Sequence, residues 1–205
     1  MSLLLSLIQR CWFLSVYKIA AIANSLILLH RVIVNLPRST LVLVPDIFVL
    51  EQKPEFFAQV AQWHHQECER QGLKSSLALR QQRLVLHVQQ NTIPKTLIAL
   101  RGNQLVGCTS LVNYTYRSSE RMPKVASESP VWLSNLFVLE NLRQQGIGNL
   151  LIDAAKNYAQ GLGLEELWLS ATDYTDYYQK RGWEIVRRTK LGGRQVNVMR
   201  VGVGA

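Results

Sequence analysis

A short segment with two glycines, residues 136–151, carries the residue types best suited to binding a phosphate. It reads Leu136-Phe-Val-Leu-Glu-Asn-Leu-Arg143-Gln-Gln-Gly146-Ile-Gly148-Asn-Leu-Leu151. Gly146 and Gly148 allow the backbone to approach a ligand closely, because neither has a Cβ. The following amides belong to the first turn of a predicted helix, where they lack intrahelical acceptors and attract anions. Since the guanidinium of Arg143 can also bind phosphate oxygens, we predict a phosphate-bearing ligand between a strand end and a helix start.

Two common phosphate-binding motifs do not fit this segment. A dinucleotide fingerprint needs a third glycine where the chain has Leu151, and a P-loop needs Gly-Lys-Ser/Thr where it has Asn149 and Leu150. The remaining pattern, Arg-x-x-Gly-x-Gly, resembles motif A of the GNAT acyl-CoA N-acyltransferases, whose loop amides hold the coenzyme A pyrophosphate. The resemblance implies coenzyme A binding by Leu136, Phe137, Val138, Arg143, Gln144, Gln145, Gly146, Ile147, Gly148 and Asn149.

The surrounding sequence extends this resemblance. Apolar residues recur at helical spacing from Ile147 to Tyr158, and glycines at 161 and 163 end the predicted helix. Downstream, residues 172–183 resemble the family's "FYEKLGF" segment, with Tyr178 at the tyrosine position. Residues 130–138 also resemble the fourth strand of many bacterial members. The resemblance covers residues 48–205 and is strongest between Val131 and Trp183.

The chain should therefore adopt an α/β fold in residues 46–205. We expect a mixed, mostly antiparallel sheet flanked by helices, with the ligand at a splay between the fourth and fifth strands, as in the GNAT fold. The expected elements are strands near residues 48–50, 96–101, 105–112, 131–138, 167–170 and 196–203, helices over 54–71, 76–88 and 147–160, and a long polar loop over 113–130.

Residues 1–45 form an apolar and basic extension. Arg10, Lys18, Arg31 and Arg38 occur here with no acidic residue, so the remaining chain carries about +5 of the formal net charge of +9. The stretch 12–29 is nearly long enough to span a bilayer, although Lys18 near its middle would be costly. Four interpretations stay open: an extension outside the working protein, a membrane anchor, a signal segment, or a helix that packs on the domain or a partner.

Other binding classes receive little support. The charge is too diffuse to indicate nucleic-acid binding. Cys11, Cys68 and Cys108 are odd in number and widely spaced, which favours reduced thiols over disulfides. His64 and His65 with Glu67 do not make a metal site, since adjacent histidines point to different helix faces. We expect no metal, a cytoplasmic domain, and membrane contact only through residues 1–45.

The family resemblance implies transfer of an acetyl group from acetyl-CoA to a primary amine of a small molecule, peptide or protein N-terminus. It implies Tyr178 as the acid that protonates the departing thiolate. An amine is mostly protonated at neutral pH, so a base or water must accept its proton. Ser134 and Asn135 lie on the predicted fourth strand but cannot act alone as bases, and Glu128 or Glu140 could act through water; none is favoured. The alternative is a non-catalytic acyl-CoA-binding sensor or scaffold. The sequence does not define the acceptor, the acyl-chain length or the oligomeric state.

Overall fold

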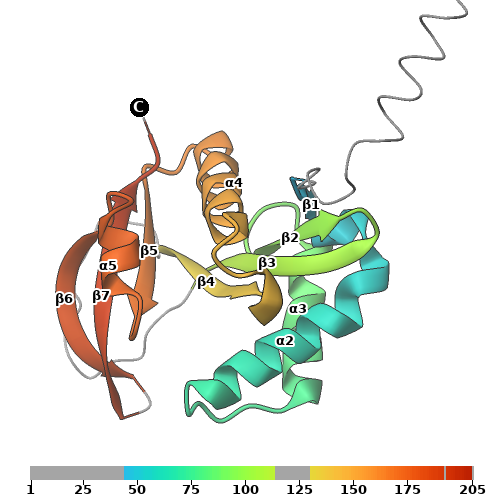
Figure 1. The fold of residues 1–205 in the computed structure, drawn as a ribbon, viewed down its shortest axis with the longest axis horizontal. Helices are drawn as coiled ribbons and strands as arrows, with labels where there is room; N and C mark the ends of the chain where they lie inside the picture. The colour runs from blue at the N-terminus through green and yellow to red at the C-terminus, as the bar shows by residue number, and fades with distance from the viewer. Residues whose placement is uncertain (1–43, 114–129, 192, 205) are drawn as a thin grey trace, which may run out of the picture. The chain divides into compact units, whose positions relative to one another are not determined.

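The computed structural model describes residues 44–113, 130–191 and 193–204, which contain one seven-stranded sheet. Its strand order is β1-β2-β3-β4-β5-β7-β6. In Figure 1, β4 lies between β3 and β5 in the middle of the sheet. The strands are β1 Asp46–Val49, β2 Lys95–Arg101, β3 Gln104–Asn113, β4 Val131–Val138, β5 Glu166–Ala171, β6 Glu184–Leu191 and β7 Arg194–Gly202. All neighbouring strands pair antiparallel except β4 and β5, which are parallel. The expected mixed, mostly antiparallel sheet is confirmed.

Strands β4 and β5 separate soon after they meet. Their only registered pair is Trp132 with Trp168, although β4 continues to Val138. The two indole rings lie 6.0 Å apart between centroids, and they pack with Val112 and Val198 in a small buried cluster. The sheet therefore consists of two parts, β1–β4 and β5–β7–β6, that diverge from this cluster.

Helices cover both faces of the first part of the sheet. The strands alternate side chains between faces, so Ile98 and Leu100 pack under α2 (Phe57–Arg70) and α3 (Leu77–Gln89). Ala99 and Val106 point to the other face and pack against α4 (Ile147–Gly161). In Figure 1, α4 accordingly lies on one side of β2 and β3, and α2 and α3 lie on the other.

The helix boundaries follow local sequence signals. Pro54 opens a 3₁₀ turn, Pro54–Phe56, and α2 begins only at Phe57, three residues later than the sequence suggested. Before α3, the Ser76 hydroxyl accepts the Leu79 amide at 3.2 Å and caps the helix. The short α5 (Thr175–Gln179) follows β5, and its tyrosines pack on the core beside Trp183.

Two expectations concern residues outside the described part. These are the N-terminal extension, residues 1–43 of which are not described, and the polar loop of residues 114–129 with its two tyrosines. Within the described ranges, none of the helices is both long and apolar enough to span a bilayer.

Beneath α2 and α3 lies a cluster of buried polar side chains that includes two histidines. His64 is 4% exposed, and its Nε2 lies 3.9 Å from the Cys108 sulfur. Burial lowers the pKa of His64 to about 3, and the nearby His87 and Arg80 add to this shift. Burial, and then the charge of Lys95, lowers the pKa of His87 to about 4. Both imidazoles are therefore neutral in the folded protein at pH 7.

These two histidines should make the fold sensitive to acid. The unfolded chain binds protons near pH 6.5 and the folded chain only near pH 3–4, so the free energy of unfolding falls as the pH drops through that window. In His64→Leu, the free energy of unfolding should fall by roughly 1–3 kcal/mol less between pH 6.5 and 4 than in the original protein, because one pKa unit corresponds to about 1.4 kcal/mol. Urea titrations over this range measure the slope, and an unchanged slope would contradict the prediction.

Candidate active site

The loop between β4 and α4 presents a row of free backbone amides. Gln144 and Gly146 adopt left-handed conformations, with φ of 63° and 83°. The first bonds of the helix N-terminus run from the amides of Asn149 and Leu150 to the Gly146 carbonyl, at 3.0 and 3.1 Å. Among the described residues, the amides of positions 144–148 have no acceptor. This concave row of donors at a helix start is suited to an anion.

A polar network fixes the wall beside this loop. The Tyr177 hydroxyl donates to Asn149 Oδ1 at 2.5 Å, and Arg181 Nε donates to the same oxygen at 2.7 Å. The Arg181 guanidinium also lies over the Tyr177 ring, 3.6 Å from its centroid. A Cβ on Gly148 would lie 3.2 Å from the Tyr177 hydroxyl. A side chain at position 148 would therefore crowd the Tyr177 hydroxyl.

A β-bulge in β4 shapes the floor of the site. Cys108 pairs with Phe137 and Ser110 with Ser134, so two residues of β4 oppose one residue of β3. Asn135 in the bulge has a φ of 52°. The edge of β4 beyond Trp132 has no registered partner in β5, which leaves the backbone groups that point away from β3 available to a ligand, although the Val138 carbonyl accepts from Arg143 Nε at 3.2 Å.

Tyr178 lies at the end of this parted edge. Its ring is half-buried and contacts the Tyr177 and Trp183 rings edge to face, with centroid distances of 5.2 and 5.8 Å. Burial, followed by the neighbouring Tyr177, raises the pKa of the Tyr178 hydroxyl well above its usual value. The phenol is protonated at neutral pH and lines the cavity.

A cavity of about 800 Å³ joins the loop, the parted edge of β4 and Tyr178. It brings together all the residues that the sequence predicted for the site except Gln145. Its lining includes Leu136, Phe137, Val138, Arg143, Gln144, Gly146, Ile147, Gly148, Asn149 and Tyr178. The Gln145 side chain does not line it, because its amide oxygen accepts from Arg101 at 3.1 Å and its nitrogen donates to the Asn141 carbonyl. Only the backbone of Gln145 remains a candidate ligand.

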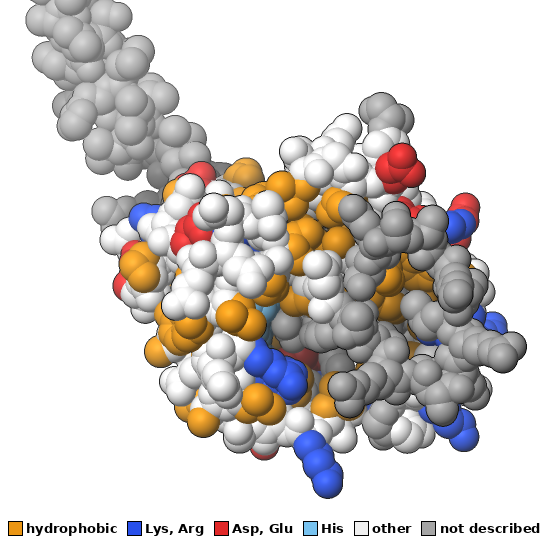
Figure 2. All heavy atoms as spheres, turned by 180° about the vertical axis from the view of Figure 1, so that it is seen from behind, with side chains coloured by type: hydrophobic (Ala, Val, Ile, Leu, Met, Phe, Trp, Pro, Cys, Tyr) orange, Lys and Arg blue, Asp and Glu red, His pale blue; other side chains and the backbone are white. Residues whose placement is uncertain are grey.

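The cavity wall contributed by α2 and α3 was not predicted as part of the site. It adds Glu67, Arg70, Arg80 and Arg83 to the lining, and the space-filling view from behind shows basic side chains next to an acidic one at a hollow (Figure 2). Arg70 binds the Glu67 carboxylate through two nitrogens, at 2.7 and 2.9 Å. No motif in the sequence marks these residues, since they come from two helices that meet only in the fold.

The four residues considered as the base differ in their position relative to the cavity. Ser134 and Asn135 line the cavity. Glu140 has a 92% exposed side chain near Arg143 and does not line the cavity. Glu128 lies outside the described residues.

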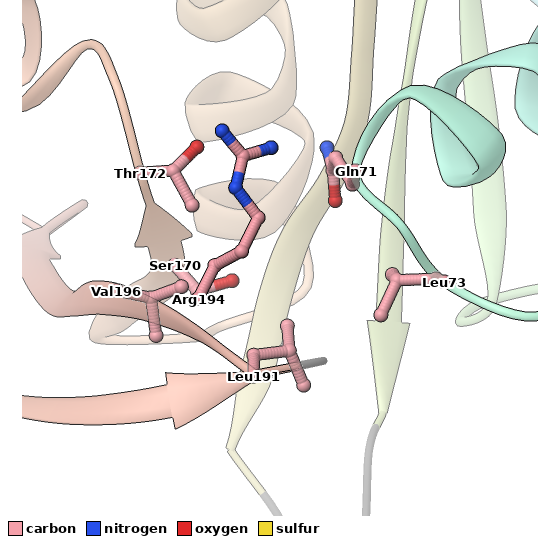
Figure 3. Close-up of a pocket in the computed structure, with 7 residues that line it drawn as sticks. All are labelled: Gln71, Leu73, Ser170, Thr172, Leu191, Arg194 and Val196. Atoms are coloured by element: carbon pink, nitrogen blue, oxygen red, sulfur yellow. The ribbon is translucent and has the colours of Figure 1, made fainter.

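A small hollow of about 20 Å³ adjoins the cavity where β5, β6 and β7 face the loop after α2. Figure 3 shows Arg194 from β7 extending between Thr172 and Gln71, with Leu191 and Leu73 facing each other below. Arg194 lies 3.9 Å from the Asp173 carboxylate, so its charge is largely compensated. This end of the cavity is lined by side chains from β5, β6 and β7 and from the loop after α2.

Comparison with known proteins identifies the family and similar folds. The model of the acetyltransferase (GNAT) family matches residues 57–183, whereas no curated protein gives a significant match. An acetyltransferase of the GNAT family from Staphylococcus aureus Mu50 is similar over 77% of this chain and 99% of its own, with 14% identity and a TM-score of 0.56. An acyl-CoA N-acyltransferase from Pseudomonas aeruginosa covers 77% and 99%, with 19% identity and a TM-score of 0.53.

An aminoglycoside 6'-N-acetyltransferase solved with coenzyme A is also similar, over 77% of this chain and 97% of that one, with 14% identity and a TM-score of 0.57. At such identities these structures establish the fold, and the family model establishes the family. Enzymes of this family use acetyl-CoA as the acyl donor. The chain therefore belongs to the acetyltransferase (GNAT) family and is an acyltransferase.

Proposed function

We propose that this protein transfers an acetyl group from acetyl-CoA to a primary amine. The observation that carries the proposal is the row of unpartnered amides at residues 144–148, which lies at the head of the parted edge of β4 in one cavity. An anion-binding turn next to an open strand edge suits a long ligand with a diphosphate and an amide-containing arm. Coenzyme A has both.

The residues present fit this donor. The loop amides and Arg143 would bind the diphosphate by charge-assisted hydrogen bonds. Gly148 leaves a cradle that a Cβ would fill, and Arg181 adds a second positive charge at the same end. Backbone groups on the free edge of β4 would pair with the pantetheine arm as a neighbouring strand would. When bound, acetyl-CoA supplies the thioester carbonyl that the amine attacks.

Tyr178 would protonate the thiolate that leaves coenzyme A. Because its pKa is raised, the phenol keeps its proton throughout the neutral range. The free edge of β4 near Phe137 and Val138 would supply N–H donors for the oxyanion that develops on the carbonyl. The residues proposed as acid and oxyanion donors, Tyr178, Phe137 and Val138, line the same cavity, which supports acyl transfer over simple storage of the ligand.

The proposed phosphate site can be tested by filling the space beside Gly148. Gly148→Val should weaken coenzyme A binding about tenfold or more, because overpacking costs about 1–3 kcal/mol and 1.4 kcal/mol corresponds to a factor of ten. Calorimetric titration with coenzyme A measures this. Gly161→Val is the matched control, since Gly161 ends the same helix and its Cβ would meet no atom within 4 Å. Equal affinities of the two variants would refute the assigned phosphate site.

The role of Tyr178 can be tested separately from binding. Tyr178→Phe should lower kcat by roughly 100-fold, the scale of one positioned acid, with little change in coenzyme A affinity. Thiol release from acetyl-CoA across a panel of amines measures the rate. Tyr158→Phe is the control, since the Tyr158 hydroxyl donates to the Asn91 carbonyl away from the cavity. Normal turnover in Tyr178→Phe would remove this residue from the mechanism.

The same assay distinguishes an enzyme from a binding module. A sensor or scaffold would bind coenzyme A but release no thiol in response to any amine. Acceptor-stimulated release would establish the enzyme.

A further inference from the structure

The cavity is strongly cationic in its described lining, which includes five arginines and a single carboxylate. Arg143 and Arg181 lie beside the anion-binding loop, where the coenzyme A phosphates would use them. Of the remaining three, Arg70 is neutralised by its two-point contact with Glu67, whose other neighbour is the Gln71 amide. Two positive charges, those of Arg80 and Arg83, therefore remain without a carboxylate among the described residues.

Both of these arginines project from α3 into the same cavity. They are three residues apart, a spacing that places two side chains on one face of a helix. Arg80 Nε donates to the Ser75 hydroxyl at 2.8 Å, which fixes the stem and leaves its terminal nitrogens free to bind. Arg83 is exposed and has no hydrogen bond or ion pair within the described residues. Both arginines line the same cavity as Cys68.

Their position argues against a role in binding the donor phosphates. Helix α3 covers the sheet face opposite α4, whose first turn holds the phosphate loop. Helix α2 instead packs on β4 through the Trp63 and Phe137 rings, and Arg80 and Arg83 line the same cavity as Ser134 and Asn135 of the β4 bulge, where the amine would approach the thioester. The two free guanidinium groups thus border the acceptor half of the cavity.

We infer that the acceptor is an amine that also carries a carboxylate or phosphate group, and that Arg80 and Arg83 bind this anion. The inference rests on the proposed acetyl transfer. Guanidinium groups bind both oxyanions through paired, charge-assisted hydrogen bonds. Such contacts would hold the anion on α3 and direct the amine towards β4. They would also repel acceptors whose second group is cationic.

Matched acceptor pairs test this inference at saturating acetyl-CoA. β-Alanine against β-alaninamide isolates a carboxylate, and phosphoethanolamine against ethanolamine isolates a phosphate; a diamine such as putrescine supplies the cationic case. The anionic member should have a kcat/KM at least about tenfold higher, since tenfold corresponds to 1.4 kcal/mol. The advantage should shrink in 0.5 M salt because salt screens exposed charges. Equal or better use of neutral and cationic amines would overturn the inference.

Substitutions of Arg80 and Arg83 test whether these two residues cause the preference for anionic acceptors. Arg83→Gln should leave folding intact because the side chain is exposed, and Arg80→Gln is the second variant. Each should lower kcat/KM for the anionic acceptor about tenfold and leave both the neutral acceptor and the KM for acetyl-CoA unchanged. Arg188→Gln removes one exposed charge from β6 outside the cavity and should change nothing. Loss of acetyl-CoA affinity in Arg80→Gln or Arg83→Gln would overturn the assignment by showing that these residues serve the donor.

A second measurement separates this inference from the proposed function. If coenzyme A binds but no amine is acetylated, the proposed function fails. The anion site is then judged by calorimetric titration of the coenzyme A-saturated protein with phosphoethanolamine and with β-alanine. Heat that Arg83→Gln abolishes would support the site, and the stronger ligand would identify the anion. No heat with either ligand would overturn it.

Discussion

The single junction between β4 and β5 governs the rest of this structure. Trp132 and Trp168 pack with their rings 6.0 Å apart where the two parts of the sheet meet, and the strands diverge beyond them. The main core cluster, which includes Leu133 of β4 and Leu169 of β5, also joins the two parts. Divergence leaves one edge of β4 free and opens the cavity. Large aromatic side chains are suited to such a junction, because they bury much apolar area at one point. The site therefore depends on a packing contact that includes none of its proposed chemical groups.

The distribution of charge gives the cavity two ends with different partners. At one end, the loop amides with Arg143 and Arg181 would bind the phosphates of the donor. At the other, Glu67 compensates Arg70, while Arg80 and Arg83 retain their charge. Tyr178 lies in the same cavity and is kept protonated by burial. A donor anion and an acceptor anion would thus be held at opposite ends, with the reacting groups between them.

The sequence predicted the parts that depend on local signals. Glycine spacing and helical periodicity located the loop and α4, and the order of motifs located Tyr178. The β4 bulge with Asn135 in a left-handed conformation was not predictable, since it arises from the register between two strands. The contact from Tyr177 and Arg181 to Asn149 and the pairing of Gln145 with Arg101 likewise join residues distant in sequence. The contact of the buried His64 with Cys108 of β3 also joins residues distant in sequence.

Hydrogen exchange of the loop amides tests the central claim most directly. Coenzyme A should slow exchange at residues 144–148 and along the free edge of β4, because both would gain hydrogen-bond acceptors. Pantetheine, which lacks the diphosphate, should protect β4 without protecting the loop. If coenzyme A binds and the amides of residues 144–148 exchange as fast as before, the diphosphate is held elsewhere and the account of this site is wrong.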